Sequence, residues 1–160
     1  LGLVGKGRIG SAVAHRAEAF GMQVVHCNRT SGIPIDELLR VSDVVSLHCP
    51  LTPDTHHLID AAALGLMKPT AILINTARGG LVEESALLGA LQSGQLAGAG
   101  LDVFASEPLA AGHALLALDN VIAAPHVAWL TRETLERSLA FAVENIRRLE
   151  SGESLRNRVV

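Results

Sequence analysis

The sequence predicts an α/β fold, a doubly wound parallel sheet with helices on both faces. Short apolar runs alternate with stretches of helical periodicity along the chain, which is the pattern of successive βαβ units. The apolar runs are nearly continuous, as in strands that are buried on both faces. The first run leads into a glycine-rich turn, and the length of 160 residues suits one domain.

Each element is placed by its apolar pattern and by the residues that interrupt it. Strands are expected at 1–4, 23–27, 43–48, 70–75, 97–103 and 120–124. Helices are expected at 8–20, 35–41, 61–67, 83–93 and 131–151. Asp60 is expected to cap the third helix. The stretch 104–119 contains Ser, Pro and Gly with little periodicity, so it is the least regular part of the chain.

The composition excludes several classes of protein. Hydrophobic residues make up 49% and charged residues 18%, which excludes a disordered chain. With 13 basic residues against 16 acidic ones and 2% aromatic residues, nucleic acid is not an expected partner. No apolar run approaches the roughly 18 residues of a membrane-spanning helix. Two cysteines, Cys27 and Cys49, and the absence of a signal peptide indicate a reducing, cytoplasmic location.

A glycine-rich motif, GKGRIG at 5–10, follows the first expected strand and opens the first expected helix. In this context Gly5 permits the tight turn, Gly7 lets the backbone approach a pyrophosphate, and Gly10 lets helix and strand pack closely. The helix N-terminus offers free N–H groups to the phosphates. The motif predicts a Rossmann-type dinucleotide-binding domain over 1–160. The alternative is a turn in which the glycines serve backbone geometry alone.

The end of the second expected strand indicates which dinucleotide is bound. NAD-binding domains place an Asp or Glu there for the ribose hydroxyls, but this chain has Asn28, Arg29 and Thr30. Because a carboxylate repels a 2′-phosphate and an arginine attracts one, NADP(H) is favoured over NAD(H). The alternative is that Arg29 is a solvated loop residue and Asn28 binds an unphosphorylated ribose.

Three charged residues follow the fourth, fifth and sixth expected strands: Arg78, Glu107 and His126. In a parallel sheet of the expected order 3-2-1-4-5-6, these strand ends lie side by side near the glycine-rich turn. The set suits hydride transfer to a ketone, in which a histidine protonates the oxygen, a carboxylate orients the imidazole and an arginine holds a substrate carboxylate. Taken singly, the three are also explained as a surface ion-pair partner, a solvated loop charge and a core histidine.

Four longer segments carry a family resemblance: LGLVGKGRIG, VVSLHCPLTPDTHHLID, MKPTAILINTARGGLVEESALLGALQSGQLAGAGLDVFASEP and LDNVIAAPHVAW. With them the chain resembles, nearly end to end, the cofactor-binding domain of the D-isomer-specific 2-hydroxyacid dehydrogenases. The resemblance implies an NAD(P)-dependent oxidoreductase. It also implies that His126 is the general acid/base, that Glu107 is its partner and that Arg78 binds the substrate.

The resemblance also implies where the dinucleotide is held. The residues expected around it are Gly5, Gly7, Arg8, Ile9 and Gly10 at the pyrophosphate, Asn28, Arg29 and Thr30 at the adenosine ribose, Cys49, Pro50 and Thr55 after the third strand, and Thr76, Ala77, Arg78, Asp102, His126, Ala128 and Trp129 towards the nicotinamide. Lys6 departs from the apolar residue that the family commonly has between these glycines. It adds positive charge near the phosphates.

Two segments, Asn-Arg-Thr at 28–30 and Pro-His-Val-Ala-Trp at 125–129, are similar to the glyoxylate and hydroxypyruvate reductase branch of the family. A small 2-oxo acid, or the corresponding D-2-hydroxy acid, is therefore the expected substrate. D-3-phosphoglycerate and D-lactate dehydrogenases remain alternatives. An alternative of another class is a dinucleotide-sensing transcriptional corepressor, because such proteins share this fold and the three charged residues.

The chain opens on Leu1, and we interpret it as part of a longer protein whose substrate domain is absent, with 155–160 as the start of the returning segment. The chain alone is therefore expected to bind cofactor but to turn over poorly. A homodimer is expected from the resemblance, although the apolar side of helix 131–151 suits packing on the sheet equally well. No metal is expected, because His56 and His57 have no cluster of further ligands beside them.

Overall fold

The computed structural model describes residues 1–158, in two compact units, Leu1–His126 and a second that begins at Val127. The strands are β1 (Gly2–Val4), β2 (Val25–Cys27), β3 (Val44–Leu47), β4 (Ile72–Asn75), β5 (Gly98–Leu101) and β6 (Val121–Ala123). The α-helices are α1 (Arg8–Ala19), α2 (Ile35–Val41), α3 (Ala61–Leu66), α4 (Glu84–Gln92) and α5 (Arg132–Glu150). Two short 3₁₀ helices are η1 (Gly79–Leu81) and η2 (Ala114–Ala117).

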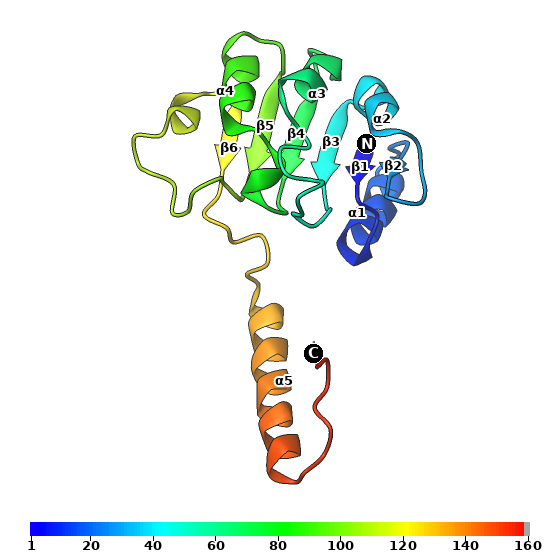
Figure 1. Cartoon of the computed structure of the whole chain (residues 1–160), viewed down its shortest axis with the longest axis vertical. Coiled ribbons are helices and arrows are strands. Elements are labelled where there is room, and N and C mark those ends of the chain that lie inside the picture. The colour runs from blue at the N-terminus through cyan, green and yellow to red at the C-terminus, as the bar shows by residue number, and fades with distance from the viewer. Residues whose placement is uncertain (159–160) are drawn as a thin grey trace. The chain divides into compact units, whose positions relative to one another are not determined.

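The strands form one parallel sheet in the order β2-β1-β3-β4-β5-β6 (Figure 1), which confirms the predicted fold class. The expected order 3-2-1-4-5-6 was wrong, because β3 pairs with β1 instead of lying beyond β2. The outer edge of β2 is already occupied by the chain that leaves it. Ile33 N–H donates to the His26 carbonyl, and Gly32 forms an antiparallel bridge with Cys27. The chain that leaves β2 thus lies beside the C-terminal part of this strand before it crosses back to pair with β1 as β3.

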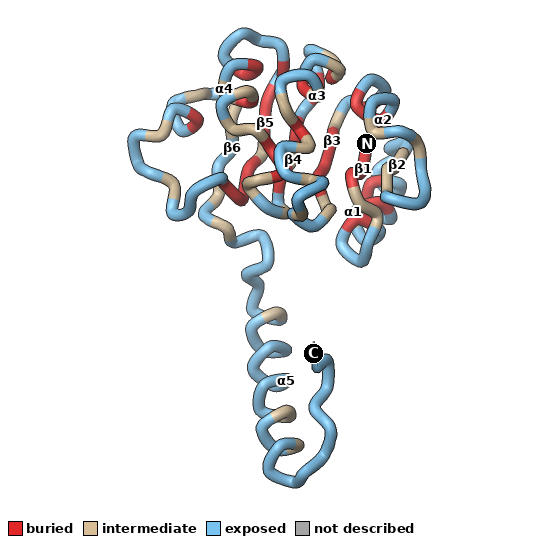
Figure 2. Tube along the Cα trace, viewed as in Figure 1, coloured by how far each residue is buried: buried red, intermediate tan, exposed pale blue. Residues whose placement is uncertain are grey.

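Helices cover both faces of the sheet, as predicted. Figure 1 shows α2, α3 and α4 side by side over one face, and most of the buried apolar residues form one cluster with them. The other face carries α1 over β1, where Leu3, Ala14 and Ala17 are buried outside that cluster. Figure 2 shows the buried residues concentrated along the strands of the first unit. At the edge of the sheet opposite β2, the side chain of Ile122 in β6 is 78% exposed.

The local signals explain most element boundaries. Asp60 Oδ1 accepts a 2.8 Å hydrogen bond from Ala63 N–H, so the predicted cap of α3 is confirmed. The stretch 104–119 is mostly irregular, but it contains η2, which the sequence reasoning missed. The imidazole of His113 caps η2 by accepting a hydrogen bond from Leu115 N–H, a role usually filled by Ser, Thr, Asp or Asn.

The helix α5 belongs to the second unit and is capped by Thr131, whose hydroxyl accepts a hydrogen bond from Thr134 N–H at 3.1 Å. None of its residues is buried, and its apolar side chains, including Leu139 and Ile146, remain exposed. No helix within residues 1–158 is long and apolar enough to cross a membrane. The expected returning segment 155–160 is described only up to Arg158, and residues 159 and 160 lie outside the described part.

Candidate active site and cofactor cleft

The glycine-rich turn has the close packing that its sequence suggests. Gly5 has φ +95°, a conformation that favours glycine, and its N–H donates to the Cys27 carbonyl at 2.9 Å. A Cβ at Gly5 would lie 2.8 Å from the backbone nitrogen of Cys49, and one at Gly10 would collide with the carbonyl oxygen of Gly5. A Cβ at Gly7 would meet nothing within 4 Å, so the turn is open on the side of Gly7.

The N-terminus of α1 follows this turn directly. Gly7 is its N-cap, and no described side chain caps the first turn, so its backbone N–H groups are available to an anion. Arg8 and Ile9 are both exposed there. The N–H of Lys6 donates a 2.6 Å hydrogen bond to Asn28 Oδ1, which ties the glycine-rich turn to the end of β2. Sequence reasoning placed both segments at the dinucleotide but did not predict this bond.

A pocket of about 550 Å³ lies where β1, β2 and β3 end. Of the predicted cofactor residues it is lined by Gly5, Gly7, Asn28, Arg29, Cys49, Pro50 and Thr55. Sequence reasoning missed its apolar walls, Ile35 and Leu58, because apolar side chains carry no chemical signal of ligand binding. At its rim Arg29 lies 4.0 Å from Asp54, and both side chains are more than 80% exposed. Thr30, also exposed, is not among the lining residues.

A second pocket, of about 650 Å³, shares His48, Cys49 and Pro50 with the first and extends to the end of β4. Ile9, Leu51, Thr76, Ala77 and Arg78 complete its lining. The two pockets therefore form one cleft along the carboxyl edge of the sheet, where a doubly wound fold binds its ligand. His48 was not predicted as a site residue. Burial lowers the pKa of His48 and so favours its neutral form, and its Nε2 lies 2.9 Å from the hydroxyl of Ser46.

The turn that carries Thr76, Ala77 and Arg78 is held by a residue that sequence reasoning also missed. Asn75, at the end of β4, is 1% exposed. Its amide group donates to the Arg78 carbonyl at 2.9 Å and accepts from Ala77 N–H at 3.0 Å. Because both polar ends of this buried side chain are satisfied inside the turn, Asn75 fixes the backbone from which the Arg78 side chain leaves.

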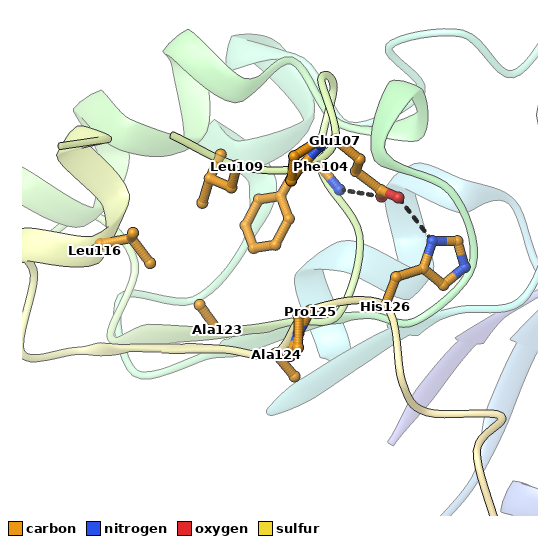
Figure 3. A pocket seen from close by; sticks show the side chains of 9 residues that line it. Phe104, Glu107, Leu109, Leu116, Ala123, Ala124, Pro125 and His126 are labelled. Atoms are coloured by element: carbon orange, nitrogen blue, oxygen red, sulfur yellow. Dashed lines mark hydrogen bonds and ion pairs between the residues drawn. The ribbon is translucent and has the colours of Figure 1, made fainter. Parts of the chain in front are cut away.

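Glu107 and His126 lie together, as Figure 3 shows. His126 Nδ1 and Glu107 Oε2 are 2.8 Å apart, while Glu107 Oε1 accepts from Phe104 N–H at 3.0 Å. The hydrogen bond from His126, then the one from Phe104, hold the pKa of Glu107 below its ordinary value. The positive charge of Arg78 acts weakly in the same direction on the pKa of Glu107, so Arg78 lies within electrostatic reach of Glu107. His126 itself adopts φ +57°, an uncommon conformation for a residue other than glycine.

An apolar pocket of about 280 Å³ lies beside the Glu107–His126 pair (Figure 3). Its remaining lining residues are apolar and come from the segment after β5, from η2 and from the end of β6: Phe104, Pro108, Leu109, Leu116, Ala123, Ala124 and Pro125. Sequence reasoning identified only the two charged or titratable residues of this pocket, because its apolar residues carry no chemical signal of ligand binding.

The remaining predicted residues are Asp102, Ala128 and Trp129. Asp102 is buried just after β5, and its N–H donates to the Asn75 carbonyl at 2.9 Å. Ala128 and Trp129 are exposed residues of the second unit, and their role at the nicotinamide stays a prediction. Within residues 1–158 no group of three or more His, Cys, Asp or Glu side chains is arranged to hold a metal ion.

Comparisons with known proteins agree with this geometry. The family model of the D-isomer specific 2-hydroxyacid dehydrogenase NAD binding domain matches residues 1–128. The chain is 45% identical to a glyoxylate reductase of Korarchaeum cryptofilum over 164 residues, covering 96% of the chain and 49% of that protein. It is 45% identical to a glycerate dehydrogenase of Methylorubrum extorquens over 157 residues, covering 95% of the chain and 50% of that protein.

Among solved structures, the TT0316 protein of Thermus thermophilus superposes with a TM-score of 0.96 at 52% identity, covering 99% of this chain and 53% of that one. The chain thus spans about half the length of the curated relatives that it matches. Sheet topology, glycine-rich turn and sequence identity all lead to one assignment. The chain belongs to the D-isomer specific 2-hydroxyacid dehydrogenase family and contains the NAD-binding domain of that family.

Proposed function

We propose that this chain is the cofactor-binding and acid/base part of an oxidoreductase that transfers a hydride between NAD(P)H and a small 2-oxo acid. The observation that carries the proposal is the Glu107–His126 pair, 2.8 Å apart, with Arg78 within electrostatic reach. All three residues follow strands at the edge where the cofactor cleft lies. The family membership supports the same reaction class.

The cleft fits a dinucleotide. Gly5 and Gly10 close the turn so tightly that a Cβ at either position would strike backbone atoms, while the side of Gly7 is open. The uncapped first turn of α1 presents N–H groups where a pyrophosphate would lie. When bound, the nicotinamide supplies or accepts the hydride. The residues of this chain supply orientation, charge and the proton.

The proton is assigned to His126. A carboxylate can only accept hydrogen bonds, so the Nδ1–H of His126 donates to Glu107 and its Nε2 is the nitrogen that exchanges a proton with the substrate oxygen. In the direction of reduction, Nε2–H protonates the oxygen as the carbonyl becomes a hydroxyl. Glu107 keeps the ring in this orientation and offsets the positive charge of the imidazolium. Arg78 binds the substrate carboxylate and polarises the neighbouring carbonyl group.

NADP(H) is the proposed preference. No carboxylate follows β2, and Arg29 lies on the rim of the pocket beside Asn28. A guanidinium there pairs with a 2′-phosphate, whereas an Asp or Glu would repel it. The side chain of Arg29 is 82% exposed and is free to turn towards the ligand.

Glyoxylate or hydroxypyruvate is the proposed substrate, because the glyoxylate reductase and glycerate dehydrogenase named above share 45% identity with the chain. A substrate domain beyond this chain, which spans about half of those relatives, is proposed to complete the substrate pocket. We also propose a homodimer, and a cytoplasmic location that suits the two free cysteines, Cys27 and Cys49.

The first experiment is a titration of the chain with NADPH and with NADH, following the fluorescence of the nicotinamide. Tighter binding of NADPH that is lost in Arg29→Ala is expected. Arg40→Ala, which removes an exposed arginine of α2 outside the cleft, is the matched control. Equal or tighter binding of NADH would contradict the NADP(H) preference.

The second experiment assays reduction of glyoxylate, hydroxypyruvate and pyruvate by the enzyme that carries the substrate domain. Reduction of glyoxylate or hydroxypyruvate that His126→Asn abolishes is expected, with NADPH binding retained. Reduction of pyruvate alone would favour a D-lactate dehydrogenase. Binding of the dinucleotide without reduction of any 2-oxo acid would favour a sensor of the corepressor type. Turnover at an ordinary rate by the 160-residue chain itself would contradict the need for a second domain.

A further inference from the structure

A second carboxylate–imidazole pair lies outside the cleft. Glu84, the first residue of α4, places Oε1 2.9 Å from Nε2 of His113, the residue that precedes η2. The two side chains are 24% and 28% exposed, less than Glu107 and His126 at 36% and 39%. The more enclosed of the two pairs is therefore the one with no place in the proposed chemistry.

Each partner of this pair makes a second hydrogen bond. Glu84 Oε2 accepts from Ala105 N–H at 3.2 Å, and His113 Nδ1 accepts from Leu115 N–H at 3.3 Å. Since Nδ1 is an acceptor, the hydrogen of the neutral ring sits on Nε2 and points to Glu84. The neutral imidazole thus satisfies both of its contacts, and the carboxylate uses both of its oxygens.

These bonds hold the irregular segment that carries Glu107 at two places. Glu84 binds the segment at Ala105, and through His113 it binds the same segment again just before η2. The backbone N–H groups of two adjacent residues donate to two different carboxylates. Phe104 N–H donates to Glu107, and Ala105 N–H donates to Glu84. Glu107 lies between the two attachment points, in a stretch with no helix or strand to hold it.

The same segment is packed against the backbone that follows Arg78. A Cβ at Gly79 would collide with the carbonyl group of Phe104, so the two backbones approach as closely as glycine allows. The position of Phe104 therefore links the Arg78 turn to the Glu107 segment, and Glu84 secures the next residue along.

We propose that Glu84 is a positioning residue for the Glu107–His126 pair, acting through Ala105 N–H and through His113 to hold segment 104–113. The expected effect of Glu84 on the reaction rate rests on the proposed function. Its expected effect on the position of Glu107 does not. Neither Glu84 nor His113 lines the cofactor cleft or the apolar pocket beside Glu107. Their effect on the reaction therefore passes through the segment that carries Glu107.

Three variants separate the contacts. Glu84→Gln keeps an oxygen for Ala105 N–H but turns an amide N–H₂ towards the Nε2–H of His113, where two donors then face each other. His113→Gln keeps a donor for Glu84 and loses the acceptor for Leu115. His113→Asn keeps the acceptor for Leu115 and loses the donor for Glu84. If Glu84→Gln fails to fold, the two His113 variants carry the test.

The first readout is the titration of the Glu107 carboxyl in this chain, followed by carbon NMR. Its pKa is held low by the hydrogen bond from His126 and then by that from Phe104, and both depend on the position of the segment. Glu84→Gln and His113→Asn are expected to raise this pKa towards the ordinary value, while His113→Gln leaves it near that of the parent. An unchanged titration in folded Glu84→Gln or His113→Asn overturns the proposal.

The second readout uses the enzyme that carries the substrate domain. Since small displacements of a catalytic group cost up to about a hundredfold in rate, Glu84→Gln is expected to lower kcat by about ten- to a hundredfold. The KM for NADPH is expected to stay unchanged, because the cofactor cleft lies elsewhere. A shifted Glu107 titration in an enzyme that reduces no 2-oxo acid would refute the proposed function and leave the positioning role in place. A normal kcat with an unshifted titration would overturn the positioning role alone.

Discussion

The backbone N–H of Lys6 donates a 2.6 Å hydrogen bond to the side-chain oxygen of Asn28, so the glycine-rich turn and the end of β2 are joined directly. The amide nitrogen of Asn28 points the other way, to the hydroxyl of Ser31 at 3.3 Å. One side chain thus sets the position of the phosphate turn and of the residues expected at the adenosine ribose.

Asn28→Asp is expected to reverse the preference between the two dinucleotides. The carboxylate keeps an acceptor for Lys6 N–H, so the turn is retained, but its charge repels a 2′-phosphate and suits bare ribose hydroxyls. We expect NADPH affinity to fall at least about tenfold, which is about 1.4 kcal/mol, while NADH affinity is kept or improved. Fluorescence titration with both dinucleotides measures the change. A parallel loss of both affinities would show that the Lys6 bond, and not the charge, had been damaged.

Asp54→Asn is expected to strengthen NADPH binding. Asp54 lies 4.0 Å from Arg29 at the rim of the pocket, where it both engages the guanidinium and repels a phosphate. Because exposed ion pairs are worth at most about 1 kcal/mol, the gain should stay within about fivefold. Asp36→Asn removes a carboxylate from a similar exposed pair, Asp36–Arg40 at 4.0 Å, and serves as the control. An equal gain in NADPH affinity in both variants would show that the gain comes from the change in net charge and not from the Asp54–Arg29 pair.

Gly10→Ala is expected to destabilise the chain by about 1–3 kcal/mol, because its Cβ collides with the Gly5 carbonyl oxygen. Gly89→Ala, in α4, is the matched comparison, because a Cβ there meets nothing within 4 Å. It is expected to stabilise the helix by up to about 1 kcal/mol. Urea unfolding of the two variants and the parent measures both changes. A Gly10→Ala chain as stable as the parent would contradict the close contact of α1 with the turn.

Glu107→Gln is expected to remove part of the pH dependence of stability. The pKa of Glu107 is lowered by its hydrogen bonds to His126 and Phe104, so the folded chain favours the ionised form. That contribution is complete above the ordinary pKa of a glutamate and is lost as the pH falls through the lowered value. The difference in unfolding free energy between parent and variant, under about 1 kcal/mol for groups this exposed, should therefore shrink in acid. A difference that stays constant from neutral to acid pH would rule this out.

The features that could be predicted from the sequence are those that short-range patterns determine. The glycine motif, the cap at Asp60 and the alternation of apolar runs were enough for the fold class and for the elements that carry Arg78, Glu107 and His126. The predicted strand order was wrong, because the pairing of β3 with β1 joins segments far apart in the chain and no periodicity reveals it. The apolar walls at Ile35 and Leu58 and the cap formed by His113 were missed for a related reason. The walls are tertiary contacts of residues that look ordinary in sequence, and the cap is a local hydrogen bond made by a residue type that seldom caps a helix.

The turn that folds back on β2 also bears on how copies of this chain can associate. Exposed strand edges pair readily with strands of other molecules, in domain swapping and in aggregates. At β2 this edge already bonds to Ile33 and Gly32 of its own chain. A strand of a second copy therefore cannot pair with β2 at His26 and Cys27, and the proposed homodimer has to form at some other place on the chain.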